Sequence, residues 1–260
     1  MKFSYTTYAI GKDLDFEDCI KLAHAGGCAG IEFRINDLDS DSPGHRHGVQ
    51  LDLQADERMQ IRRRMEDEYL EIVQICTGFR FEYADEALRR RHIEGAQMAV
   101  DLAADLNAPF IRVFGNNIPK GVNAGDCTRW VGGALSNVAD YALQKGIYIL
   151  LEMHGQFNFW GYALGALDSA KRDNVGILYN CDKRDLVGGS VLPTYERVAA
   201  HIRHVHLHNF EDDFPYQELF FLLNRDGYTG YVSAEIQPSQ DPLRVMALTG
   251  ALYRALQKIG

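Results

Sequence analysis

Apolar and polar positions along the chain repeat with two different periods. Between positions 93 and 106 apolar residues recur every three or four residues, which is the period of an amphipathic helix. The segment 110–114 that follows is short, apolar and rich in aromatic and β-branched residues, which is typical of a strand. Asn107 and Pro109 stand between the two segments and are expected to end the helix.

This succession of strand and helix recurs along the whole chain. Strands are expected at 3–8, 29–34, 72–77, 110–114, 147–152, 175–180, 203–209 and 230–235. Helices are expected at 15–25, 56–68, 93–106, 127–144, 163–170, 194–200, 215–224 and 242–258. A long loop is expected at 36–54, and loops of this kind in compact domains often act as lids.

Strands that are separated by helices pair in parallel through crossover connections. Eight such units in 260 residues match the size of a closed (β/α)8 TIM barrel. A doubly wound open sheet is the alternative, but no glycine-rich phosphate loop follows the first strand. Because no linker or change in composition divides the chain, we predict a single barrel domain over residues 1–260.

The strand at 203–209 has the most informative polar pattern. Side chains of a strand alternate between two faces, so His204, His206 and His208 share one face. A lone histidine on such a face is usually a core residue with a hydrogen-bond partner. Three together indicate metal binding or proton transfer, because imidazole is a common ligand and proton carrier.

Other strands carry polar residues on the face that points into the predicted barrel. They are Glu32, Arg34, Arg112, Glu152, His154, Asn180, Ser233 and Glu235. Glu152 and Glu235 end their strands, where the chemistry of such barrels lies. Two buried carboxylates without partners would be costly, and a divalent cation would remove that cost. The alternative is that Arg112 or a histidine neutralises them as a structural ion pair.

The composition of the chain argues against some classes of binding partner. The net charge is −9, which argues against a nucleic-acid substrate, because nucleic-acid binders carry a basic face. No apolar run reaches the roughly 20 residues of a membrane span, and the first residues lack the apolar stretch of a signal peptide. The five cysteines are scattered and form no Cys-x-x-Cys pair, as in a reducing cytosol. We therefore expect a cytoplasmic protein that acts on a small molecule.

Six segments together resemble the sugar phosphate isomerase/epimerase family of xylose isomerase-like TIM barrels. They are GIEFR at 30–34, IRVFG at 111–115, LEMH at 151–154, NVGILYN at 174–180, HVHLHN at 204–209 and GYTGYVSAEI at 227–236. The resemblance covers nearly the whole chain. It implies one divalent ion, Mn²⁺ or Mg²⁺ with Zn²⁺ or Co²⁺ as alternatives, and a homodimer or homotetramer.

The resemblance implies that Glu152, Asn180, His206 and Glu235 are the metal ligands. This chain departs from the family at three places. Asn180 replaces the usual aspartate, and Lys183 stands where many members have histidine, so Asp182 is an alternative ligand. His208 and Asn209 replace a common lysine and aspartate pair.

The activity that the resemblance implies is isomerisation or epimerisation in carbohydrate metabolism. The metal would bind the carbonyl and hydroxyl oxygens of a sugar or small hydroxy-carbonyl compound and stabilise an enediolate, while Glu152 and Glu235 act as acid and base. Six residues are expected to contact the substrate: Glu32, Arg34, Arg112, His154, Lys183 and His208.

Three other activities remain open for the same barrel. A dehydratase of a keto-cyclitol or a dehydroshikimate-like compound would use the same enolate to expel a β-hydroxyl group. A hydrolase like endonuclease IV needs more histidines and a basic groove, which the charge of −9 disfavours. The last alternative is a barrel that binds a polyol without turnover, and Asn180 in place of the usual aspartate would be the evidence for it.

Overall fold

The computed structural model describes residues 1–36 and 45–259 of the protein. Its strands form one closed parallel barrel in sequence order. They are β1 (Lys2–Thr6), β2 (Gly30–Arg34), β3 (Glu71–Arg80), β4 (Phe110–Phe114), β5 (Tyr148–Glu152), β6 (Val175–Asn180), β7 (Ile202–Leu207) and β8 (Tyr231–Ala234). Because β1 pairs with both β2 and β8, every described strand has two neighbours.

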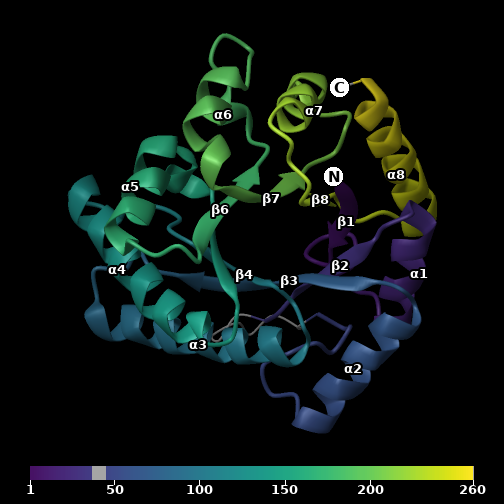
Figure 1. Ribbon diagram of the computed structural model, residues 1–260, viewed down its shortest axis with the longest axis horizontal. Helices are drawn as coiled ribbons and strands as arrows, with labels where there is room; N and C mark the ends of the chain where they lie inside the picture. The colour runs from purple at the N-terminus through teal and green to yellow at the C-terminus, as the bar shows by residue number, and fades with distance from the viewer. Residues whose placement is uncertain (37–44, 260) are drawn as a thin grey trace.

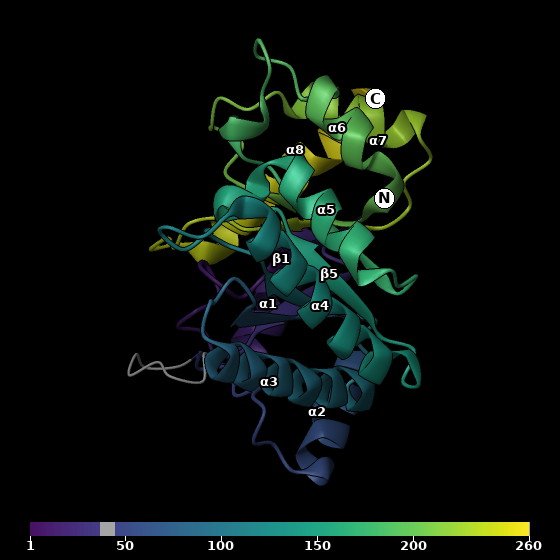
Figure 2. The same cartoon turned by 90° about the vertical axis from the view of Figure 1, so that its left-hand side faces the viewer.

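A helix follows each strand and lies on the outside of the barrel (Figure 1). The helices are α1 (Phe16–Gly26), α2 (Ala55–Asp67), α3 (Glu86–Asp105), α4 (Ala124–Leu143), α5 (Trp160–Ala170), α6 (Leu192–Val198), α7 (Tyr216–Arg225) and α8 (Pro242–Ile259). Short 3-10 helices are η1 (Gly155–Asn158), η2 (Lys183–Asp185) and η3 (Ala199–His201). Figure 2 shows α3, α4 and α5 over the outer face of the strands.

This architecture confirms the predicted (β/α)8 barrel and the order of its units. The start of α3 was placed too late, at 93, because its first turns are polar and show no apolar period. The helix begins at Glu86, where Asp85 accepts hydrogen bonds from two backbone amides of the first turn. β3 is also longer than predicted and reaches Arg80. The loop expected at 36–54 lies in part outside the described residues, at 37–44.

The outward faces of the strands are apolar and completely buried, as predicted. Ile31, Phe33, Ile111, Val113, Val205 and Leu207 have no exposed surface. No helix among the described residues has the length and apolar content needed to cross a membrane.

Contacts between the two ends of the chain hold the ring closed. In the last helix, the Tyr253 hydroxyl and the Gln257 amide donate hydrogen bonds of 3.0 Å and 3.1 Å to the carbonyl oxygen of Met1. Phe3 of β1 stacks on Tyr253 with ring centroids 4.5 Å apart. Helix α8 therefore fixes β1 next to β8, and α1 packs beside it (Figure 1).

Candidate active site and metal centre

The carboxyl ends of the strands surround a cavity of about 530 Å³. Polar strand residues that line it are Arg34, Arg112, Glu152, Asn180 and Glu235, the last directly after β8. A parallel barrel brings together the ends of strands that are far apart in sequence. The register aligns Asn180 with His206, and His206 with Ser233, so the ends of β6, β7 and β8 lie at one level.

Three potential metal ligands converge at this cavity, two in its lining and one buried next to them. Glu152, His206 and Glu235 each offer one ligand atom, and these atoms lie within 4.8 Å of one another. They come from the ends of β5, β7 and β8. Glu152 and His206 are buried, and Glu235 is partly buried and faces the cavity. Two carboxylates and one imidazole suit a divalent cation such as Mn²⁺, Mg²⁺ or Zn²⁺.

Arg112 balances the charge of Glu152. Its Nη1 lies 2.8 Å from Glu152 Oε2, and both side chains are almost completely buried. The guanidinium also stacks over the Phe114 ring at 4.1 Å from the centroid. The pair is held by charge and not by an aligned hydrogen bond, because Glu152 Oε2 has no hydrogen-bond partner among the described residues. The sequence offered an ion pair with Arg112 as the alternative to a metal ion, and Glu152 makes that ion pair.

His206 has a carboxylate on each side of its ring. Nδ1 lies 3.0 Å from Glu235 Oε2, and Nε2 lies 2.9 Å from Glu32 Oε2. Burial opposes the charge of His206, but Glu32 and Glu235 hold the pKa of this imidazole well above its ordinary value. Burial would raise the pKa of Glu235, yet the hydrogen bond and charge of His206, together with the charge of Arg112, lower it to about 2.

Asn180 links the two sides of the site through its amide group. Its Nδ2 donates to Glu152 Oε1 at 3.2 Å, and its Oδ1 accepts from His208 Nε2 at 2.7 Å. The oxygen that would bind a cation is therefore used by His208. The assignment of Asn180 as a metal ligand stays a prediction, and the contacts are those of a hydrogen-bonding residue.

Asp182 and Lys183 lie away from the metal centre. The Asp182 carboxylate pairs with the Arg184 guanidinium and caps the first turn of η2. Lys183 is exposed and is not among the described residues that line the cavity. Its contact with substrate stays a prediction.

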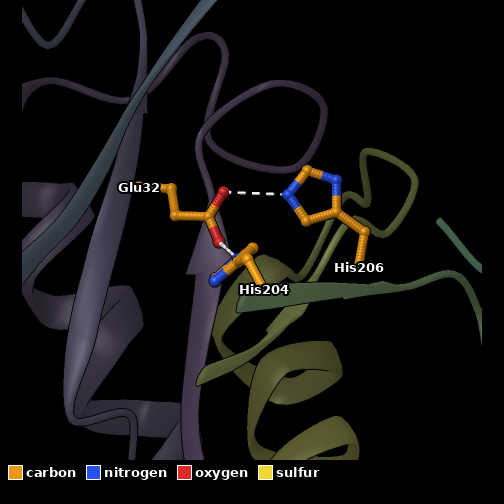
Figure 3. A group of neighbouring side chains, drawn as sticks. All are labelled: Glu32, His204 and His206. Carbon is orange, nitrogen blue, oxygen red and sulfur yellow. Dashed lines mark hydrogen bonds and ion pairs between the residues drawn. The ribbon is translucent and has the colours of Figure 1, made fainter. Parts of the chain in front are cut away.

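Glu32, which was predicted to contact the substrate, is not among the described residues that line the cavity. It has no exposed surface and lies below the cavity, inside the barrel. Figure 3 shows its carboxylate between His204 and His206, with one oxygen directed to each ring. Burial would raise the pKa of Glu32, but the charges of the two imidazoles hold it well below its ordinary value.

Arg34, Arg112, His154 and His208 line the cavity, where they were predicted. His154 Nδ1 lies 3.2 Å from Asn116 Oδ1, and its ring is 5.0 Å from the Phe114 ring. The cavity also has a wall that the sequence did not reveal. Its additional polar and aromatic residues include Tyr8, Arg80, Tyr83, His92, Phe114 and Asn116. Most of them stand at strand ends, in loops or on α3, where no alternation of two faces identifies them.

Comparison with known proteins agrees with this architecture. The family whose sequence model matches residues 20–253 is described as the xylose isomerase-like TIM barrel. This match spans most of the 260 residues. The chain belongs to the xylose isomerase-like TIM barrel family. The predicted family is thereby confirmed. A search of curated proteins found no match.

Several solved structures share the xylose isomerase-like barrel with this chain. The structure of L-ribulose 3-epimerase has a TM-score of 0.82 at 16% identity, over 99% of this chain and 94% of that one. D-psicose 3-epimerase from Clostridium cellulolyticum H10, solved with D-tagatose, has 0.79 at 12% identity over 99% of both chains. 3-keto-D-glucoside 4-epimerase from E. coli has 0.79 at 15% identity, over 98% and 99%. At these identities the likeness is one of fold.

Proposed function

We propose that this protein is a divalent-metal-dependent epimerase or isomerase that acts on a sugar or a small hydroxy-carbonyl compound. The observation that carries the proposal is the meeting of ligand atoms of Glu152, His206 and Glu235 within 4.8 Å, with both carboxylates lining the cavity. The structurally similar proteins named above are sugar epimerases, which supports the same class of substrate.

The residues present fit a divalent cation. Glu152 and Glu235 would supply two negative oxygens and His206 one nitrogen, while Arg112 would remain beside Glu152 as a counter-charge. Mn²⁺ or Mg²⁺ suits a set rich in oxygen ligands, and Zn²⁺ or Co²⁺ also accepts one nitrogen. When bound, such an ion supplies Lewis acidity toward the oxygens of a carbonyl compound.

Glu152 and Glu235 would move the proton. They enter the cavity from β5 and from the end of β8, on two sides of His206. We propose that one carboxylate removes the proton from the carbon next to the carbonyl, and the other returns it from the opposite face. Return to the opposite face inverts that carbon. Arg112, whose Nη1 lies 2.8 Å from Glu152 Oε2, would hold that carboxylate in place.

The cavity wall would orient the substrate. His154 and His208 offer ring nitrogens, and Arg34 and Tyr8 lie on the β1–β2 side of the cavity. Phe114 gives an apolar surface against which a sugar ring or chain can pack. The oligomeric state, the cytoplasmic location and the identity of the metal stay predictions from the sequence.

The test is proton exchange with solvent. Protein loaded with Mn²⁺ is incubated in D₂O with a panel of ketoses and keto-sugars, and products are analysed by mass spectrometry and NMR. We expect deuterium on the carbon next to the carbonyl. Glu152→Gln and Glu235→Gln should each lower turnover by about 10²–10⁴-fold, the usual contribution of a positioned acid or base. Asp185→Asn, a buried acid that does not line the cavity, is the matched control.

Other outcomes would contradict the proposal in different ways. Products that lack a hydroxyl group would identify a dehydratase. Tight binding of a polyol without exchange would identify a binding protein. Full activity in both glutamine variants would remove these two carboxylates from the mechanism.

A further inference from the structure

A buried polar cluster lies directly below the metal centre. Its centre is Glu32 of β2, and its other members are His204 and His206 of β7 and Gln74 and Cys76 of β3. Glu32 Oε2 accepts from His206 Nε2 at 2.9 Å, from Gln74 Nε2 at 2.9 Å and from Cys76 Sγ at 3.2 Å. Glu32 Oε1 is hydrogen-bonded to His204 Nε2.

We propose that Glu32 is a positioning residue that fixes the ring of His206 for metal binding. This inference rests on the proposed metal-dependent function and adds a role that the cavity residues do not have. A carboxylate can only accept, so His206 Nε2 must carry a hydrogen and donate it to Glu32. Nδ1 faces Glu235 and Glu152, and it is the nitrogen that would give up its hydrogen and turn its lone pair to a cation bound between them.

The geometry leaves little room for another arrangement of the ring. His206 stands edge-on to His204, with ring centroids 5.4 Å apart and planes at 86°. His204 and Glu32 have no exposed surface, and His206 has almost none, so a rotated ring would find no water to replace its partner. Figure 3 shows the Glu32 side chain of β2 and the His206 ring of β7 directed toward each other across the inside of the barrel.

The hydrogen bonds of Gln74 predict how substitutions at Glu32 will behave. In Glu32→Gln, the amide oxygen is drawn to the Oε2 position, because Gln74 and Cys76 both donate there. His206 keeps a neutral acceptor, and the amide nitrogen takes the Oε1 place and faces His204 Nε2, which can accept from it when the hydrogen of that ring is on Nδ1. In Glu32→Ala no acceptor remains. The loss of metal affinity should therefore be graded, small for glutamine and larger for alanine.

The experiment measures Mn²⁺ affinity of purified metal-free protein by competition with a chelator. Loss of an outer partner of a metal-binding histidine typically costs 10–100-fold. We expect Glu32→Gln to bind Mn²⁺ about tenfold more weakly than wild type, and Glu32→Ala to bind it about 100-fold more weakly. Asp185→Asn, which removes a buried carboxylate that bonds Asn158, should keep the wild-type affinity.

A second measurement needs no variant and so does not depend on how the variants fold. Wild-type protein labelled with ¹⁵N-histidine is loaded with Zn²⁺ and studied by NMR. We expect the His206 ring to carry its hydrogen on Nε2 and to bind the metal through Nδ1. Metal on Nε2 would overturn the inference, as would Mn²⁺ affinity of Glu32→Ala within twofold of wild type. Wild type that binds no Mn²⁺ would overturn the proposed function, and this inference with it.

Discussion

At the scale of single residues, Asn180 decides the charge of the candidate metal centre. It stands between Glu152 and His208, donating to the first and accepting from the second. An aspartate at this place would add a third carboxylate and would have no hydrogen to donate to Glu152. Like charges at this distance repel each other unless a cation lies between them.

We therefore expect Asn180→Asp to bind Mn²⁺ about tenfold more tightly or better and to be less stable without metal. Chelator competition and thermal unfolding with and without Mn²⁺ measure the two effects. Asn209→Asp adds the same charge just beyond β7, where Asn209 accepts from the Gln237 backbone, and serves as control. Unchanged affinity in Asn180→Asp, with the side chain turned from the ion, would mean that residue 180 is not a ligand.

The buried carboxyl group of Asp185 should make the free energy of unfolding depend on pH. Burial, and next the charge of Asp182, raise the pKa of Asp185 to about 8. Its Oδ1 accepts from Asn158 Nδ2 at 2.6 Å, and its Oδ2 has no hydrogen-bond partner in the part of the chain that the structure describes. In the unfolded chain the same group has its ordinary pKa of about 3.9. Between these values the folded protein holds a proton that the unfolded chain has lost.

The contribution of Asp185 to stability is thus complete below about pH 4 and is lost as the pH rises toward 8. Asp185→Asn cannot lose a proton, so it should be more stable than wild type by about 1–2 kcal/mol at pH 8 and equal to it near pH 4. Urea unfolding at the two pH values measures the difference. A variant that is less stable at pH 8 would show that Asp185 is ionised and paired in the folded state.

Sequence reasoning at the residue scale identified which strand face each side chain occupies but not its depth. Glu32 and Arg34 share a face, yet Arg34 lines the cavity and Glu32 lies one layer below it. Alternation has a period of two and contains no information on depth. Depth follows from the register, which pairs Glu32 with Thr6 and Gln74 inside the barrel. The site at Glu152, His206 and Glu235 was predictable because each lies at or next to the end of its strand.

At the scale of elements, the order of strands and helices was predictable because apolar periods differ between the two. Errors fell on ends that are polar, such as the first turns of α3. The close approach of α4 to α5 was not predictable, because it depends on which glycine of α4 faces the neighbouring helix. Helix α4 contains two adjacent glycines, of which Gly132 is buried and Gly133 is exposed.

This pair gives a matched test of helix packing. A methyl group on Gly132 would meet the Ser169 side chain and lie 2.7 Å from the Ala166 carbonyl oxygen of α5, whereas one on Gly133 would meet nothing within 4 Å. We expect Gly132→Ala to lower the free energy of unfolding by about 1–3 kcal/mol. Gly133→Ala should raise it by about 0.5–1 kcal/mol through helix propensity. Denaturant unfolding measures both, and equal effects at the two positions would mean that α4 and α5 are not in close contact.

At the scale of the whole molecule, the barrel brings acids from distant parts of the chain to one point. Glu152 and Glu235 are held close by a ring that closes where β1 pairs with β8, and α8 contacts Met1 beside that pairing. An unfolded chain has no such cluster. A cation that binds there stabilises the folded protein alone, by about 2.7 kcal/mol when its concentration is 100 times the dissociation constant.

We therefore expect Mn²⁺ to raise the melting temperature of metal-free protein by roughly 5–10 °C, since about 1 kcal/mol shifts a chain of this size by about 2–4 °C. A chelator should reverse the shift.

The protein has a net charge of −9, so weak binding to surface acids must be separated from binding at the site. Glu235→Gln removes one carboxylate from the site and should abolish most of the shift, whereas Asp185→Asn should retain it, because Asp185 is not among the residues that converge there. The same shift in Glu235→Gln and wild type would place the stabilising cation outside the cavity.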